Sequence, residues 1–201
     1  MSLRHAKSQP SAKDWRFYCD SDFAGNTEPQ NKRRSQNGYT AVFNEAPVFW
    51  ASKVSSVCFA HPKIGEAHAD MSSGAAEVYA AGNATQDFLH LSYVAEELGI
   101  GFELPFNLQI DNTAAEAFAN DTVIKTKLKH IDCRQDWVRI LRDRTICTPT
   151  HVDTKLNVAD LFTKILPADD FERLTRLSAL NSCSYRHRRL ALVYLSAFCK
   201  L

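Results

Sequence analysis

The sequence predicts an α/β protein in which helices pack on a mixed sheet. Two observations support this fold class. Four short β-rich runs lie between residues 15 and 60, and strands alternate with helical segments after about residue 70. Consecutive short strands favour antiparallel pairing, whereas strands that alternate with helices favour parallel pairing. A chain of 201 residues suffices for one ordinary domain with an appendage.

The first half of the chain predicts the meander. Residues 1–14 are polar and form a lead-in, and 15–20 alternate aromatic and polar positions before ending in acids, as a strand that runs into a site would. Residues 21–37 hold Gly, Pro, Asn and charges, which predict a loop. Three further β-rich runs follow, at 38–44, 47–53 and 55–60. We expect Trp50, in the middle of one run, to pack in the core.

The second half predicts alternating helices and strands. Between residues 72 and 98 apolar side chains recur with a period close to 3.6, which predicts one long helix that ends at Gly99. The later elements are a strand over 105–111, a helix over 113–120, a charged helix over about 130–143, a strand over 145–152 and a final helix that starts at 158–164.

The composition is that of a folded domain, with 45% hydrophobic and 23% charged residues. Lys and Arg number 24 against 23 acids, so contact with nucleic acid would depend on a local basic patch. No apolar run reaches the roughly 18–20 residues that span a bilayer, and the first twenty residues lack the apolar core of a secretory signal. The six cysteines form no CxxC pair. We therefore expect an intracellular protein, in the cytoplasm or nucleus, with reduced thiols and no membrane partner.

Four acids stand where the predicted elements begin or end. Asp20 and Asp111 end predicted strands, Glu77 lies one turn into the long helix, and Asp160 opens the final helix. No Lys or Arg occupies these positions, so carboxylates converging there would repel one another unless divalent cations were bound. Oxygen ligands favour Mg²⁺ or Mn²⁺, and two such ions commonly serve phosphodiester hydrolysis. The alternative is that these acids are solvated loop residues.

At these residues the sequence resembles a known family, the ribonuclease H domain of copia-type LTR retrotransposon polyproteins. Seven motifs carry the resemblance in order: DSDFAG (20–25), KRRSQNGY (32–39), PVFWASK (47–53), SSGAAEVYAA (72–81), IDNTAAEAFA (110–119), KTKLKHIDCR (125–134) and NVADLFTKIL (157–166). Each is weak alone, but the series is specific. One departure is Ala75, which stands where the family has a second helix acid.

The resemblance implies a ribonuclease H-like fold with a five-stranded mixed sheet over residues 15–167. It places the catalytic and metal-binding carboxylates on Asp20, Glu77, Asp111 and Asp160, with two Mg²⁺ ions for which Mn²⁺ can substitute. The implied activity is endonucleolytic cleavage of the RNA strand of an RNA–DNA hybrid. The implied partners are the hybrid and the reverse transcriptase portion of the parent polyprotein. Asp22 remains the alternative to Asp20, because strand alternation puts both acids on one face.

Basic residues form local patches that the resemblance connects with phosphate binding. The first patch is Lys32–Arg34, from which we select Arg34. The second patch lies within residues 125–134, and from it we select Lys127, Lys129 and His130. Each patch could equally be a solvated face. His151 stands nine residues before Asp160, as does a histidine that aids product release in some cellular ribonucleases H, and it could equally be a surface residue. Residues 168–201 leave the family pattern, and we expect an unselected tail rather than a docked helix.

Two other functions compete with the hybrid nuclease. An integrase-type nuclease of the same fold class would order its acids Asp, Asp, Glu, whereas Glu comes second in this chain. A catalytically inactive retrotransposon remnant would act at most as a nucleic-acid-binding module. The foreign tail and the absence of a polymerase-like sequence favour the remnant, and the survival of all four acids favours the enzyme.

Overall fold

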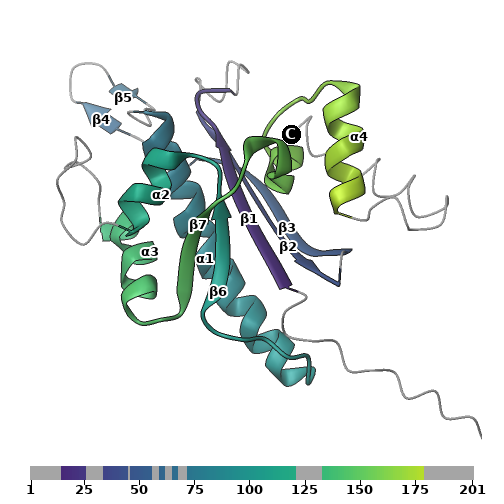
Figure 1. The fold of residues 1–201 in the computed structure, drawn as a ribbon. Coiled ribbons are helices and arrows are strands. Elements are labelled where there is room, and N and C mark those ends of the chain that lie inside the picture. The colour runs from purple at the N-terminus through teal and green to yellow at the C-terminus, as the bar shows by residue number, and fades with distance from the viewer. Residues whose placement is uncertain are drawn as a thin grey trace, which may run out of the picture.

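A five-stranded sheet organises the computed structural model, which describes residues 15–25, 34–44, 46–55, 59–61, 65–67, 72–120 and 133–178. The sheet has the strand order β3-β2-β1-β6-β7 (Figure 1). Its strands are β1 (Trp15–Asp22), β2 (Gln36–Phe43), β3 (Ala46–Val54), β6 (Phe106–Ile110) and β7 (Cys147–His151). The helices are α1 (Ser73–Glu97), α2 (Thr113–Asn120), α3 (Cys133–Asp143) and α4 (Ala168–Leu177), with 3-10 turns η3 (Thr154–Leu156) and η4 (Val158–Phe162).

The sheet is mixed, as predicted. β1, β2 and β3 form an antiparallel meander, whereas β6 pairs with both β1 and β7 in parallel. The chain between β1 and β6 and the chain between β6 and β7 both include helices, as parallel neighbours require. The predicted five-stranded mixed sheet with flanking helices is therefore confirmed.

Three expected features differ from the structure. The run at 55–60 does not extend the meander, because β4 (Phe59–His61) pairs with β5 (Gly65–Ala67) in a separate two-stranded sheet. The segment after Val158 forms a 3-10 turn rather than an α-helix. Trp50 is 49% exposed, because β3 is an edge strand and the residue lies on its outward-facing side. A β-rich pattern alone identifies neither edge strands nor the sheet that a strand joins.

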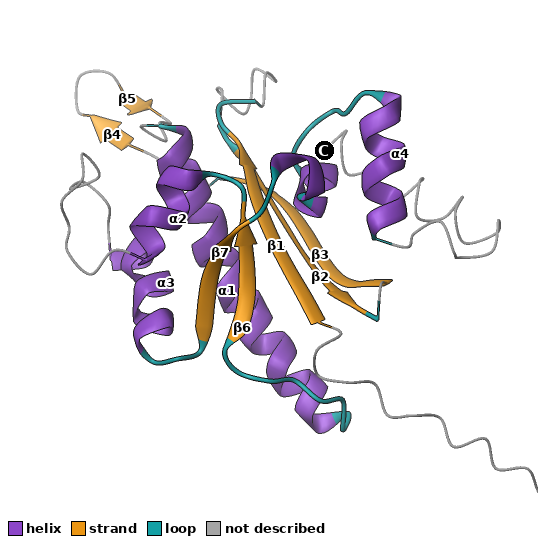
Figure 2. Ribbon diagram, in the orientation of Figure 1, coloured by secondary structure: helices purple, strands orange, loops and turns teal. Residues whose placement is uncertain are grey.

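Helices α1, α2 and α3 cover one face of the sheet; in Figure 2, α2 and α3 lie on the left and α1 runs behind the strands. Their apolar side chains meet Phe17 of β1 and Leu108 of β6 in the larger core. Phe88 of α1 is fully buried there, and its ring contacts the rings of Phe17 and Tyr39. α1 ends as predicted before Gly99, whose φ of 67° favours glycine. None of the helices in the described ranges is long and apolar enough to span a membrane.

The opposite face of the sheet is covered by η4 and α4. Tyr18 and Val42 of the sheet pack there against η4, and Leu174 of α4 is buried in the same cluster. Residues 168–177 of the expected tail thus form a helix that packs on the sheet, and the expectation of an unselected tail stays a prediction. Apolar residues at Phe171 and Leu174, three positions apart, give α4 its packing face. Residues 179–201, including the rest of the tail, lie outside the described residues.

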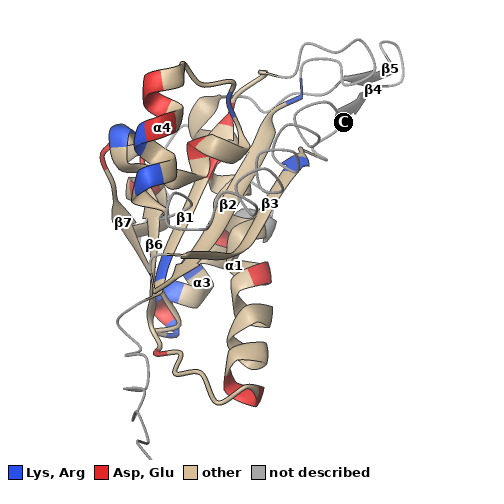
Figure 3. Cartoon of the chain, turned by 90° about the vertical axis from the view of Figure 1, so that its right-hand side faces the viewer, with Lys and Arg blue, Asp and Glu red and all other residues tan. Residues whose placement is uncertain are grey.

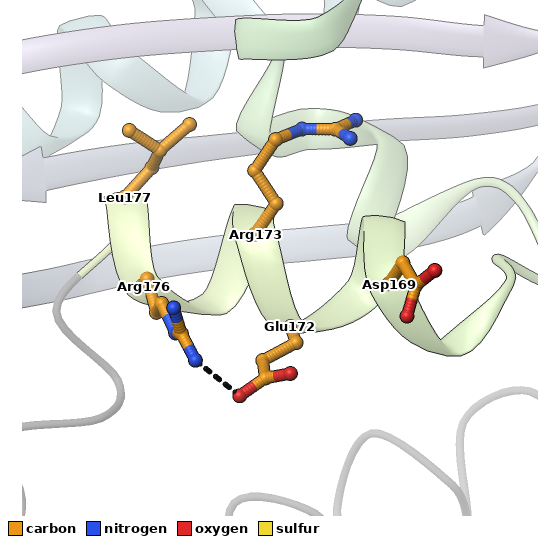
Figure 4. A pocket seen from close by; sticks show the side chains of 5 residues that line it. All are labelled: Asp169, Glu172, Arg173, Arg176 and Leu177. Carbon is orange, nitrogen blue, oxygen red and sulfur yellow. Dashed lines mark hydrogen bonds and ion pairs between the residues drawn. The ribbon is translucent and has the colours of Figure 1, made fainter.

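The outward side of α4 is polar. A surface hollow of about 370 Å³ is lined by Asp169, Glu172, Arg173, Arg176 and Leu177 (Figure 4). Glu172 and Arg176 form an ion pair of 2.5 Å across one helical turn, and in Figure 3 the acids of α4 lie toward its start and the basic residues toward its end. Both partners are more than half exposed, so the pair contributes little to stability.

Gly38 of β2 lets η4 approach the sheet closely. A Cβ at this position would lie 2.5 Å from Thr163 Cγ2 and 3.1 Å from the backbone carbon of Phe162. Gly38 is the antiparallel partner of Asp20 in β1, so the close approach occurs beside that acid. Ser52 of β3 holds the same segment by donating a 2.6 Å hydrogen bond to the Phe162 carbonyl.

Phe88→Ala should lower the free energy of unfolding by about 3–5 kcal/mol, because it leaves a cavity in the larger core. Urea denaturation followed by circular dichroism measures the change. Tyr93→Ala is the matched control on the same helix, since Tyr93 is 63% exposed and should change stability by less than about 0.5 kcal/mol. Equal effects of the two substitutions would contradict the described core.

Gly38→Ala should destabilise the protein by about 1–3 kcal/mol, because the new methyl group displaces η4. Gly74→Ala in α1 is the control, since the nearest atom to its Cβ would be Ala114 Cβ at an ordinary 3.6 Å. The control should be neutral or stabilising, because alanine favours a helix over glycine. The same denaturation experiment compares them, and a tolerated Gly38→Ala would show that η4 does not pack as described.

Candidate functional site

Asp20 and Asp111 are brought together by the register of two parallel strands. Cys19 of β1 pairs with Ile110 of β6, so the next residue on each strand is an acid at the same edge of the sheet. The carboxyl ends of parallel strands are the usual place for a site in sheets of this kind. Asp20 is fully buried and Asp111 is partly exposed.

Glu77 reaches the same edge from α1. The helix begins after Ser72, whose side chain accepts a hydrogen bond from the Ala75 backbone N–H and caps it. Glu77 lies one turn further along, and its Oε1 accepts a 3.1 Å hydrogen bond from the Ser21 backbone N–H. One oxygen from each of Asp20, Glu77 and Asp111 lies within 4.8 Å of the others, which is close enough for a common metal ion.

Asp160 comes from η4, on the other face of the sheet. Asn157 positions this turn: its Nδ2 donates to the Cys19 carbonyl at 3.0 Å, and its Oδ1 accepts from the Ala159 backbone N–H at 3.1 Å. The Asn157 side chain therefore ties η4 to β1 and caps the turn at once. Acids from the sheet, from α1 on one face and from η4 on the other face therefore converge at one end of β1.

Lys164 contradicts the expectation that the acids lack a basic partner. Its Nζ lies 3.1 Å from Asp20 Oδ1 and 2.9 Å from Asp160 Oδ1, so the ammonium group stands between the two carboxylates. The hydroxyl of Thr163 donates a short hydrogen bond to the other oxygen of Asp20. Lys164 was not predicted, because it stands four residues beyond the nearest of the four acid positions. The i, i+4 spacing from Asp160 was a usable signal.

The close packing of carboxyl groups changes their affinities for protons. Burial, with the charges of Asp20 and Asp111, raises the pKa of Glu77 to about 10. Burial and Asp20 raise the pKa of Asp160 to about 7, although Lys164 opposes the shift. Burial and Asp20 also raise the pKa of Asp111. For Lys164, burial lowers the pKa, but Asp20 and Asp160 outweigh it and keep the ammonium charged.

One oxygen of Glu77 has no hydrogen-bond donor among the described residues. The carboxyl group is 4% exposed, and its Oε2 makes no hydrogen bond, whereas Oε1 is held by Ser21. A buried acceptor without a partner is costly, so a proton or a bound cation has to satisfy it. Together with the nearby Asp20 and Asp111, this atom makes the three-carboxylate cluster suited to a cation.

Asp22 lies apart from this cluster. Its carboxyl group folds over the turn that follows β1, where a Cβ on Gly25 would lie 1.8 Å from Asp22 Oδ2. The Gly25 N–H donates to the Asp22 carbonyl at 3.3 Å and closes the turn. Asp20, rather than Asp22, is the acid within 4.8 Å of Glu77 and Asp111.

The other selected residues divide into two groups. Arg34 precedes β2 and is half-buried, and His151 is exposed at the end of β7, where its backbone pairs with Ile110 beside Asp111. Lys127, Lys129 and His130 lie outside the described residues, so the structure does not locate the second basic patch.

Comparison with curated proteins finds relatives among transposon polyproteins. The chain is 27% identical over 165 residues to the retrovirus-related Pol polyprotein from transposon TNT 1-94 of Nicotiana tabacum, across 82% of the chain and 11% of that protein. It is 26% identical to the corresponding polyprotein from transposon RE2 of Arabidopsis thaliana, across 79% of the chain and 10% of that protein. The chain thus spans about a tenth of these relatives' length. No protein-family model matches it.

Comparison with solved structures finds ribonucleases H1. A crystal structure of LC11-RNase H1 in complex with an RNA/DNA hybrid gives a TM-score of 0.48 at 14% identity, covering 74% of this chain and 93% of that chain. Another structure of LC11-RNase H1, isolated from compost, gives a TM-score of 0.49 at 16% identity, covering 75% and 92%. The chain is thus similar in sequence to a segment of retrovirus-related Pol polyproteins from transposons, in agreement with the resemblance indicated by its motifs.

Proposed function

We propose that the chain is a ribonuclease H-type, metal-dependent endonuclease that cleaves the RNA strand of RNA–DNA hybrids. The observation that carries the proposal is the convergence of Asp20, Glu77 and Asp111 within 4.8 Å at the carboxyl ends of β1 and β6. The order of the acids and the seven motifs around them support the same activity. The relatives are Pol polyproteins, so we infer that the partners are the hybrid and the reverse transcriptase portion of the parent polyprotein.

The donor set fits a divalent cation. All ligands are carboxylate oxygens, which suit Mg²⁺ or Mn²⁺. Glu77 Oε2 supports binding of such an ion, because the atom is buried and makes no hydrogen bond with the described residues. We propose Asp20, Glu77, Asp111 and Asp160 as the residues that hold two ions, with Asp20 rather than Asp22 as the first ligand. When bound, the ions supply an activated water and stabilise the charge on the leaving oxygen.

The protein's own residues hold the carboxylates ready. The Ser21 N–H fixes Oε1 of Glu77 and so holds this carboxyl group beside Asp20 and Asp111. Asn157 holds η4 and thus Asp160 against β1. His151, exposed beside the end of β6, is placed to assist product release, and Arg34 precedes β2 as a candidate phosphate contact. We propose Lys127, Lys129 and His130 as further phosphate contacts, since cations give sequence-independent affinity for the hybrid.

One observation favours the inactive remnant as a second candidate. The Lys164 ammonium already neutralises Asp20 and Asp160, so the fold holds two of the four acids together without metal. A protein that had lost its chemistry could keep this arrangement and still bind nucleic acid. Cleavage of a hybrid separates the two candidates directly.

Asp111→Asn should reduce cleavage of a labelled RNA–DNA hybrid in Mg²⁺ by about 10²-fold or more, because it removes one ligand of the proposed ion. Gel analysis of the RNA strand measures the rate. Asp153→Asn is the matched control, since Asp153 caps η3 and is exposed. A wild-type chain that binds the hybrid and leaves it intact would support the remnant instead.

The metal-free protein should lose stability as the pH rises from about 5 to 8.5. Glu77, Asp111 and Asp160 have raised pKa values, so in this range the folded state binds more protons than the unfolded chain. Stability is therefore full below the ordinary carboxyl pKa and is lost as the pH rises toward the folded values. We expect the melting temperature in EDTA to fall by at least about 5 °C.

Two comparisons check the cause of this pH dependence. Glu77→Gln should flatten the profile, because glutamine does not titrate in this range. Several millimolar Mg²⁺ should flatten it as well, because the ion replaces the protons. Scanning calorimetry measures all three profiles, and a wild-type melting temperature that is independent of both pH and Mg²⁺ would show that the acids are not assembled as described.

A further inference from the structure

We propose that Lys164 is a resident cation that occupies the place of the second ion in the substrate-free protein. One divalent ion then binds among Asp20, Glu77 and Asp111, and a second binds between Asp20 and Asp160 only when the ammonium group leaves. This inference rests on the proposed function, because it concerns the same four carboxylates. It adds that ion loading is sequential and is controlled by one side chain.

The four acids are not equivalent in the structure. Asp20, Glu77 and Asp111 each offer an oxygen within 4.8 Å of the others, and Glu77 Oε2 is buried without a donor. Asp160 is not part of that group. It is joined to Asp20 through Lys164 Nζ, at 2.9 Å and 3.1 Å from the two Oδ1 atoms. Among the described residues, Lys164 thus forms ion pairs with both acids of the second subsite, but with only Asp20 of the first.

The ammonium and a divalent ion exclude each other between Asp20 and Asp160. Both are attracted to the carboxylates that Lys164 now contacts through their Oδ1 atoms, and two cations within a few ångströms repel each other. The side chain of Lys164 is 31% exposed and has a flexible stem, so the ammonium has a route to solvent. Thr163 stays on the other oxygen of Asp20 and keeps that carboxylate in place when Lys164 moves.

The phosphates of a bound nucleic acid offer the displaced ammonium a new partner. The hybrid would then favour release of Lys164 and so favour entry of the second ion. The substrate-free protein is therefore predicted to hold one divalent ion tightly. The second ion is predicted to bind tightly only when the hybrid is present.

The experiment is Mn²⁺ titration of the substrate-free full chain, with free Mn²⁺ measured by electron paramagnetic resonance. Wild type should bind one ion, and a second at least tenfold more weakly. Lys164→Met should strengthen the second site at least tenfold, because the competing charge is gone. Lys164→Arg should keep the wild-type pattern. Lys155→Met in η3 is the matched control, since Lys155 forms no ion pair with the described residues.

The outcomes are distinct. Two sites of equal affinity in the wild type, or no change in Lys164→Met, would overturn the inference and leave the proposed nuclease intact. Failure of wild type to bind any Mn²⁺ would instead contradict the metal dependence in the proposed function. If Lys164→Met does not fold, Asp160→Asn decides: it should retain the first ion and lose the second, and loss of the first ion would overturn the assignment of subsites.

Discussion

Repulsion among buried carboxylates is the constraint on which the rest of this structure depends. The fold brings Asp20, Glu77 and Asp111 within 4.8 Å of one another and places Asp160 beside them. Such a cluster is unfavourable unless protons, hydrogen bonds or cations compensate for it. The Ser21 N–H, the Thr163 hydroxyl and the Lys164 ammonium all contact these carboxylates. These three groups, which compensate for the repulsion, therefore belong to the site together with the four acids.

The sequence predicted the parts of this site that depend on strand ends and helix starts. Asp20 and Asp111 follow β-rich runs and Glu77 follows a helix start, and the structure brings these three together. Patterns of this kind are local, so they can be recognised in the sequence without knowledge of the fold. The long helix and the parallel strands were predicted for the same reason.

The remaining features depend on contacts between distant segments. Lys164 contacts Asp20 although 144 residues separate them, and the local sequence around either residue does not predict this contact. The choice between Asp20 and Asp22 also lay beyond alternation, which puts both acids on one face, whereas in the structure the Asp22 carboxyl group lies over the turn at Gly25. Trp50 looked like a core residue until β3 proved to be an edge strand. The motif series indicated the resemblance to transposon polyproteins without resolving any of these points.

The tie between η4 and β1 has a consequence for synthesis. Asn157 contacts Cys19 across 138 residues, and Thr163 contacts Asp20 across 143. Closing loops of this length is entropically costly, and a chain made from its N-terminus cannot make these contacts until η4 has left the ribosome. The strands and α1 are synthesised before η4. Asp160 and Lys164 are only four residues apart, so they leave the ribosome together. A nascent chain therefore acquires its fourth carboxylate and the cation that neutralises it in the same step.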